Sequence, residues 1–192
     1  MRRAAGALLL LAAALLLGAA GETFPIPKEE NQFFYVQRSL NANTIVYTAR
    51  LDGEGRLDAR RPVDVFWRRF NDEGERKELS KLERSLAFGV RADPAPGQPG
   101  AFVMRVISYP KRSAVLRLVD GVPRLEAKVA GEPSRLDHAY LEVDEIGSVP
   151  SVTRVDLYGY SLAFGGVPGE PGYSPFIGNG DFIAMKGVER QL

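Results

Sequence analysis

The 192-residue sequence contains no cysteine, a single histidine and a single tryptophan. Without cysteine the chain forms no disulfide, has no thiolate to bind a metal or attack a substrate, and offers no cysteine for a lipid at a leader cleavage site. A domain of this kind has to be held together by its hydrophobic core. Apolar residues make up 45% of the chain and charged residues 26%, which is typical of a globular protein.

The sequence also has no excess of charge of one sign. The formal net charge is only +1, and positive and negative residues are interspersed. A nucleic-acid-binding domain usually carries a basic patch or stripe, and none is visible here. We therefore expect no nucleic-acid partner and no strong attraction to anionic lipid.

Residues 1–21 have the pattern of a signal peptide. Arg2 and Arg3 precede an apolar run over residues 4–17, and small residues at 18–21 suit a peptidase. The run is shorter than the roughly 20 residues that a membrane span needs, although an uncleaved anchor is the alternative. We expect a periplasmic or secreted protein with no stable membrane span after cleavage, which would change the net charge from +1 to −1 by removing the two arginines.

Residues 22–164 are predicted to form a single β-rich domain, followed by a Gly/Pro-rich C-terminal tail at 165–192. Apolar alternation and turn residues predict strands at 33–39, 44–51, 63–70, 101–109, 114–119, 125–129, 138–146 and 152–162. Asp120 and Gly121 are typical of a two-residue hairpin. The pattern predicts a mainly β fold, an antiparallel meander forming a small barrel or strongly curled sheet with one short helix.

The stretch at residues 62–90 holds that helix and the only tryptophan. Ser80 and Glu83 have the spacing of a capping box, which marks a helix start. Leu79, Leu82 and Leu86 fall on one side of the helix, and we expect this stripe to pack on the outer face of the strand at 63–70.

Candidate catalytic groups are few. His138 lies near Asp137, Glu142 and Asp144, but metal sites usually draw several ligands from different elements. Adjacent carboxylates on a strand face opposite ways, so they do not form an acid–base pair. We predict no catalytic residue, metal site or cofactor, with a hydrolase that uses carboxylates or His138 as the alternative.

Three arginines share strand faces with apolar residues, namely Arg38, Arg68 and Arg117. A buried arginine needs a partner in the protein or in a ligand. The alternative is that these side chains lie at strand ends and extend to water.

Several segments resemble the bacterial domain-of-unknown-function family 4833, over residues 33 to about 163. They are FFYVQRSLNANTIVYTARLD at 33–52, PVDVFW at 62–67, ELSKLERSLAFGV at 78–90 and VTRVDLYGY at 152–160. The resemblance implies an exported envelope domain and implies no activity.

These observations predict a non-enzymatic β-barrel binding module for a small apolar or amphipathic ligand, or for an envelope protein partner. The predicted ligand-binding residues are Arg38, Ser39, Asn41, Asn43 and Trp67, with hairpin geometry as the alternative explanation for the two asparagines. A purely structural or interaction module is a further alternative. The sequence predicts no oligomeric state.

Overall fold

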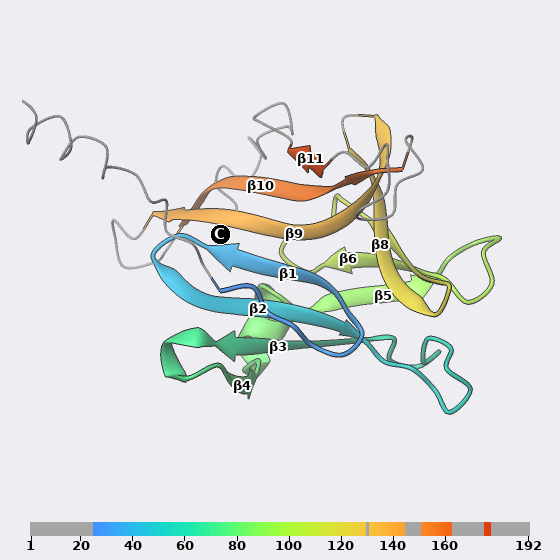
Figure 1. The fold of residues 1–192 in the computed structure, drawn as a ribbon, viewed down its shortest axis with the longest axis horizontal. Coiled ribbons are helices and arrows are strands. Elements are labelled where there is room, and N and C mark those ends of the chain that lie inside the picture. The colour runs from blue at the N-terminus through green and yellow to red at the C-terminus, as the bar shows by residue number, and fades with distance from the viewer. Residues whose placement is uncertain (1–24, 130, 145–150, 163–174, 178–192) are drawn as a thin grey trace, which may run out of the picture.

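A computed structural model describes residues 25–129, 131–144, 151–162 and 175–177. Its strands form one strongly curled, open sheet, a half-barrel, as Figure 1 shows. The described residues include a single short α-helix. The fold class predicted from the sequence is therefore confirmed. The predicted signal peptide and most of the C-terminal tail lie outside the described residues.

The first four strands form one half of the sheet, which we call the first wing. Neighbours in the wing pair antiparallel. Alternation places Ile45 and Tyr47 on the concave face, where both are fully buried, while Val46 lies on the other face. The strands are β1 (Gln32–Arg38), β2 (Asn41–Ala49), β3 (Val63–Arg69) and β4 (Glu75–Glu78). The short helix η2 (Phe70–Asp72) links β3 to β4.

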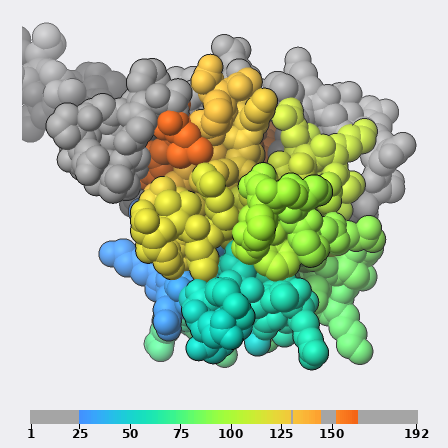
Figure 2. Space-filling view, turned by 90° about the vertical axis from the view of Figure 1, so that its right-hand side faces the viewer, coloured from blue at the N-terminus to red at the C-terminus, as the bar shows by residue number. Residues whose placement is uncertain are grey.

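Four later strands form the second wing, which is a regular antiparallel meander. Asp120 and Gly121 join β7 to β8 and both have positive φ, 53° and 77°, as a tight hairpin of the predicted kind requires. The strands are β5 (Val90–Pro94), β6 (Phe102–Val106), β7 (Ala114–Val119) and β8 (Val122–Val129). Figure 2 looks at the end of the molecule where this hairpin lies beside the turns that follow β2 and β5.

Strand β9 (Glu132–Asp144) joins the two wings. Its first part pairs antiparallel with β8, from Glu132 to Leu136, and its later part pairs with β1, from His138 to Leu141. The wings thus leave the same edge of one long strand in different directions (Figure 1). The β1–β9 pair is parallel, so the sheet is not the uninterrupted antiparallel meander that the sequence predicts. On the other edge, β10 (Ser151–Ser161) pairs with β9, and β11 (Pro175–Ile177) pairs with β10.

The predicted helix is present as α2 (Lys81–Leu86), and its capping box is confirmed. Ser80 Oγ accepts a hydrogen bond from the Glu83 amide at 3.2 Å, and the Glu83 carboxylate accepts one from the Ser80 amide at 2.7 Å. The predicted packing of its leucine stripe is wrong: Leu82 and Leu86 are 67% and 61% exposed. Along the chain, the helix connects β4 to β5, which are the outer strands of the two wings. Of the three leucines in the predicted stripe, only Leu79, just before the helix, is buried.

Side chains from β3 and from the neighbouring β4 cover the outer face of β3. The guanidinium of Arg76 on β4 lies 3.7 Å from the ring centroid of the fully buried Phe66. The segment before β1 also reaches this side, since Glu29 forms an ion pair with Arg68 of β3 and the Pro25 carbonyl accepts a hydrogen bond from Gln37 of β1. These contacts replace the helix packing that the leucine spacing indicates.

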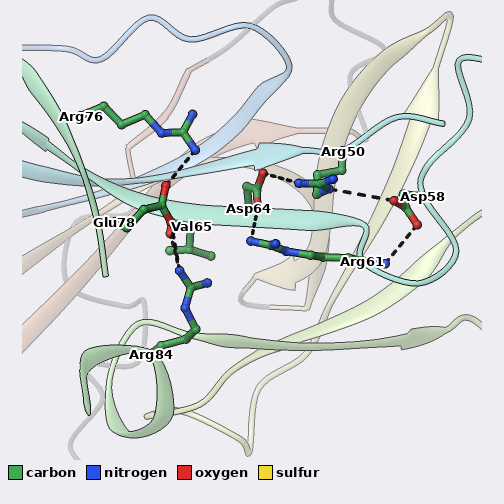
Figure 3. A network of polar contacts seen from close by, with 8 residues as sticks. All are labelled: Arg50, Asp58, Arg61, Asp64, Val65, Arg76, Glu78 and Arg84. Atoms are coloured by element: carbon green, nitrogen blue, oxygen red, sulfur yellow. Dashed lines mark hydrogen bonds and ion pairs between the residues drawn. The ribbon is translucent and has the colours of Figure 1, made fainter. Parts of the chain in front are cut away.

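Ion pairs tie the neighbouring loops to β3 and β4, as Figure 3 shows. Asp64 pairs with Arg50 at 3.1 Å and also with Arg61, while Glu78 pairs with Arg76 at 3.1 Å and with Arg84 of α2 at 3.2 Å. Most of these side chains are partly exposed, so each pair is expected to contribute less than about 1 kcal/mol. No helix among the described residues has the length and apolar character needed to cross a membrane.

Candidate functional site

The five predicted ligand-binding residues lie on the β1–β2 hairpin and on β3. Asn41 and Asn43 hold turn geometry: the Asn41 side chain accepts a hydrogen bond from the Asn43 amide at 2.8 Å, and the Asn43 side chain accepts one from the Asn71 amide at 3.0 Å. Ser39 Oγ accepts a hydrogen bond from the Val143 amide at 2.8 Å, which extends the β1–β9 contact. The contacts of these three side chains fix the hairpin against its neighbours.

Trp67 and Arg38 lie close together in the structure. The Arg38 guanidinium lies 5.1 Å from the centre of the Trp67 ring system. The Trp67 indole donates a hydrogen bond to the Glu83 carboxylate at 3.1 Å and meets the Phe88 ring edge-on at 5.4 Å. Burial would raise the pKa of Glu83, but hydrogen bonds from Ser80 and Trp67 outweigh it and hold that pKa below its usual value. A ligand role for these residues stays a prediction.

Of the three arginines that share strand faces with apolar residues, two have carboxylate partners within the protein. Arg68 pairs with Glu29 and donates a hydrogen bond to the Gly74 carbonyl at 2.7 Å. Arg117 pairs with Glu126 on the neighbouring strand at 2.7 Å. Neither arginine depends on a ligand for its partner.

His138 lies in a stack of three aromatic rings on the convex face of the sheet. Its ring is parallel to that of Tyr35 at 4.7 Å and to that of Tyr158 at 4.4 Å, between strands β1 and β10. Its Nδ1 lies 2.8 Å from the Asp137 carboxylate. Within the described ranges, no group of three or more His, Asp or Glu side chains gathers where it could hold a metal ion.

A cavity of about 560 Å³ lies between the two wings. Its walls are apolar side chains from both wings and from β9 and β10, and they belong to the same cluster as the core. None of the five predicted ligand-binding residues is among those that line it. Representative wall residues are Phe34, Val36, Met104, Leu125, Leu136 and Val155.

The segment that follows α2 closes one side of the cavity. Phe88 lines the cavity, and its carbonyl accepts a hydrogen bond from the buried hydroxyl of Tyr47 at 3.1 Å. The Gly89 carbonyl accepts one from the Ile107 amide at 2.8 Å, which ties the segment to the second wing. Burial raises the pKa of Tyr47 well above its usual value, so its hydroxyl remains a neutral donor at physiological pH.

Position 89 requires glycine because there is no room for a side chain there. A Cβ on Gly89 would lie 1.8 Å from the carbonyl oxygen of Arg84, which is backbone and has no freedom to swing aside. The sequence pattern places a short helix within residues 62–90, and in the structure the segment with that helix connects β4 to β5, the outer strands of the two wings. No periodic signal marks this role, because it depends on contacts between strands far apart in the chain.

The rim of the cavity is formed largely by the loop 107–113 between β6 and β7. Among the described lining residues, most of the polar ones belong to this loop: Ser108, Tyr109, Lys111, Arg112 and Ser113. The other two polar residues of that described set are Tyr47 in the wall and Lys128 near the end of β8. The described lining of the cavity is thus apolar in the interior, with polar side chains supplied mainly by the loop 107–113.

The family model for a domain of unknown function (DUF4833) matches residues 34–166, more than half of the chain. This match confirms the resemblance noted in the sequence. No curated protein and no solved structure gives a significant match.

Proposed function

The chain belongs to the DUF4833 family, whose description names no activity, and we propose that this member is a non-enzymatic binding module of the bacterial envelope. Its ligand is a small molecule with an apolar body, held in the cavity between the two wings. The observation that carries the proposal is the cavity itself, which measures about 560 Å³ and is lined mainly by apolar side chains. The envelope location is supported by the signal-peptide pattern of residues 1–21.

The cavity has the size and character of a small-molecule site. Ligand sites usually measure about 300–1,000 Å³ and are lined mainly by apolar side chains with a few polar groups. A water molecule occupies about 30 Å³ in the liquid, so this space equals roughly 18 water-sized groups. A single alkyl chain or a compact apolar molecule fits this volume.

The walls favour a ligand over water. An apolar space offers water few hydrogen-bond partners, and the one buried hydroxyl in the wall, Tyr47, already donates to Phe88. Each methylene group moved from water into such a space stabilises the complex by about 0.8 kcal/mol, which is about fourfold in affinity. The affinity for alkyl chains should therefore rise steeply with length until the cavity is full.

The test is a titration of the full chain with straight-chain alcohols of increasing length. The sole tryptophan, Trp67, contacts the cavity-lining Phe88, so its emission reports filling of the cavity. We expect the dissociation constant to fall up to about fourfold per added methylene and then to level off.

Native mass spectrometry of protein purified from its own envelope gives an independent readout. A retained apolar molecule in a one-to-one complex supports the proposal. An alcohol series without saturable binding, together with protein that carries no ligand, would refute it.

A further inference from the structure

Within the described part of the chain, the charged residues that line the cavity all have the same sign. They are Lys111, Arg112 and Lys128, and none of the described lining residues is an aspartate or glutamate. All three are exposed, and none forms an ion pair with another described residue. By contrast, most arginines on β3 and its neighbours are neutralised by aspartate or glutamate (Figure 3).

Two of these cations are held at the rim by the loop itself. The Tyr109 amide donates a hydrogen bond to the Val106 carbonyl at 3.0 Å, and the Arg112 amide donates one to the Tyr109 carbonyl at 3.4 Å. The Ser108 amide is bound to the Ala87 carbonyl at 3.2 Å, which fastens the loop to the segment after α2. The backbone therefore presents Lys111 and Arg112 beside the opening.

Lys128, the third cation, contributes less directly to the positive charge at the rim. Lys128 lies between Ala127 and Val129, which both line the cavity, and successive side chains on a strand point to opposite faces. Its side chain thus leaves the concave face, although its charge adds to the positive potential of the same end of the wing. Ser108 and Ser113, exposed on the rim loop, supply hydroxyl groups that donate to an oxygen ligand.

We infer that the ligand is a single-chain amphiphile with an anionic oxygen head group, a carboxylate or a phosphate ester, bound tail-inward with its head between Lys111 and Arg112. The inference rests on the proposed function, because it assigns the head group of a molecule whose tail fills the cavity. Arginine and lysine recognise carboxylate and phosphate oxygens through charge-assisted hydrogen bonds. A cationic head group would meet like charges at the same rim.

The experiment compares three ligands with twelve carbon atoms each: dodecanoate, 1-dodecanol and dodecylamine at pH 7.4. Each competes with Nile red, a neutral apolar dye, for the full chain. We expect dodecanoate to bind about three- to tenfold more tightly than dodecanol, because each exposed charge contact contributes modestly. We expect dodecylamine to bind more weakly than dodecanol. The preference for the acid should shrink between 0.01 and 0.5 M salt as the charges are screened.

Matched variants distinguish the effect of the two charges at the rim from the effect of the net charge of the chain. Lys111→Glu with Arg112→Glu should abolish or invert the preference for the acid while leaving dodecanol binding unchanged. Lys111→Gln with Arg112→Gln should abolish it without introducing repulsion. Arg60→Glu with Lys81→Glu changes the net charge of the chain by the same amount at two exposed positions away from the cavity, and should retain the preference.

The possible outcomes distinguish the anionic head group from the proposed function itself. Equal binding of acid and alcohol by the unchanged protein, or an unchanged preference in the Lys111/Arg112 variants, overturns the anionic head group and leaves the apolar cavity as a binding site. Failure of all three ligands to displace Nile red overturns the proposed function itself. Dodecyl phosphate, a phosphate ester that also has twelve carbon atoms, is the final comparison. Tighter binding than dodecanoate assigns the head group as phosphate, and weaker binding assigns it as carboxylate.

Discussion

Filling the cavity with a larger side chain provides a sharp test of whether the space between the wings exists in solution. Ala127 of β8 lines the cavity and is only partly buried, so its Cβ faces open space. Ala127→Leu adds three carbon atoms to that space. If the cavity is present and unstrained, each added group contributes at most about 0.8 kcal/mol, and we expect a gain in unfolding free energy of about 1–2 kcal/mol.

For a chain of this length, 1 kcal/mol changes the melting temperature by about 2–4 °C. Thermal unfolding of the ligand-free Ala127→Leu variant should therefore show a rise of about 2–8 °C. The same variant should bind the longest alcohols worse than the unchanged protein, with the optimal chain about three carbons shorter, because the new side chain occupies that volume. Stability and affinity thus move in opposite directions.

The control is Ala59→Leu, which adds the same atoms at an exposed turn residue remote from the cavity and should change neither quantity. If the wings instead close up in solution, Ala127→Leu overpacks the interior and lowers the unfolding free energy by about 1–3 kcal/mol. A fall in melting temperature on that scale would refute the reasoning, since it would show that the cavity has no room.

Two further predictions concern the segment that connects β4 to β5. Gly89→Ala should destabilise the fold by at least about 1–3 kcal/mol in urea unfolding, because its Cβ would clash with the Arg84 carbonyl, whereas Gly53→Ala, with nothing within 4 Å, should cost little. Because the pKa of Glu83 is lowered in the folded state, its stabilising effect should be present at neutral pH and be lost as the pH falls through that pKa. The unfolding free energies of the unchanged protein and Glu83→Gln should therefore differ at pH 7 and converge as the pH falls below the lowered pKa of Glu83, and a constant difference would contradict this assignment.

Local sequence signals predicted the elements well, because each depends on neighbouring residues. The alternation in β1, β2 and β3, the Asp120–Gly121 hairpin and the Ser80–Glu83 capping box all appear where the sequence places them. The packing of α2 was predicted wrongly, since helical spacing identifies an apolar stripe without saying what covers it. β4 was missed because its residues, ERKE, are all polar and exposed, with no apolar alternation. β5 was also missed, and β9 begins at Glu132, earlier than the predicted start at residue 138.

The sequence by itself determined a mainly β chain with a leader pattern, no cysteine chemistry and one capped helix, because composition and short-range periodicity carry that information. Only the tertiary structure decided that β9 pairs with β8 along one part and with β1 along another, so that the wings diverge and leave a cavity. Strand pairing over about a hundred residues is set by the summed packing of both wings, which no local pattern records. For the same reason the sequence directed attention to the β1–β2 hairpin, while the cavity and its basic rim at Lys111 and Arg112 emerged from the fold.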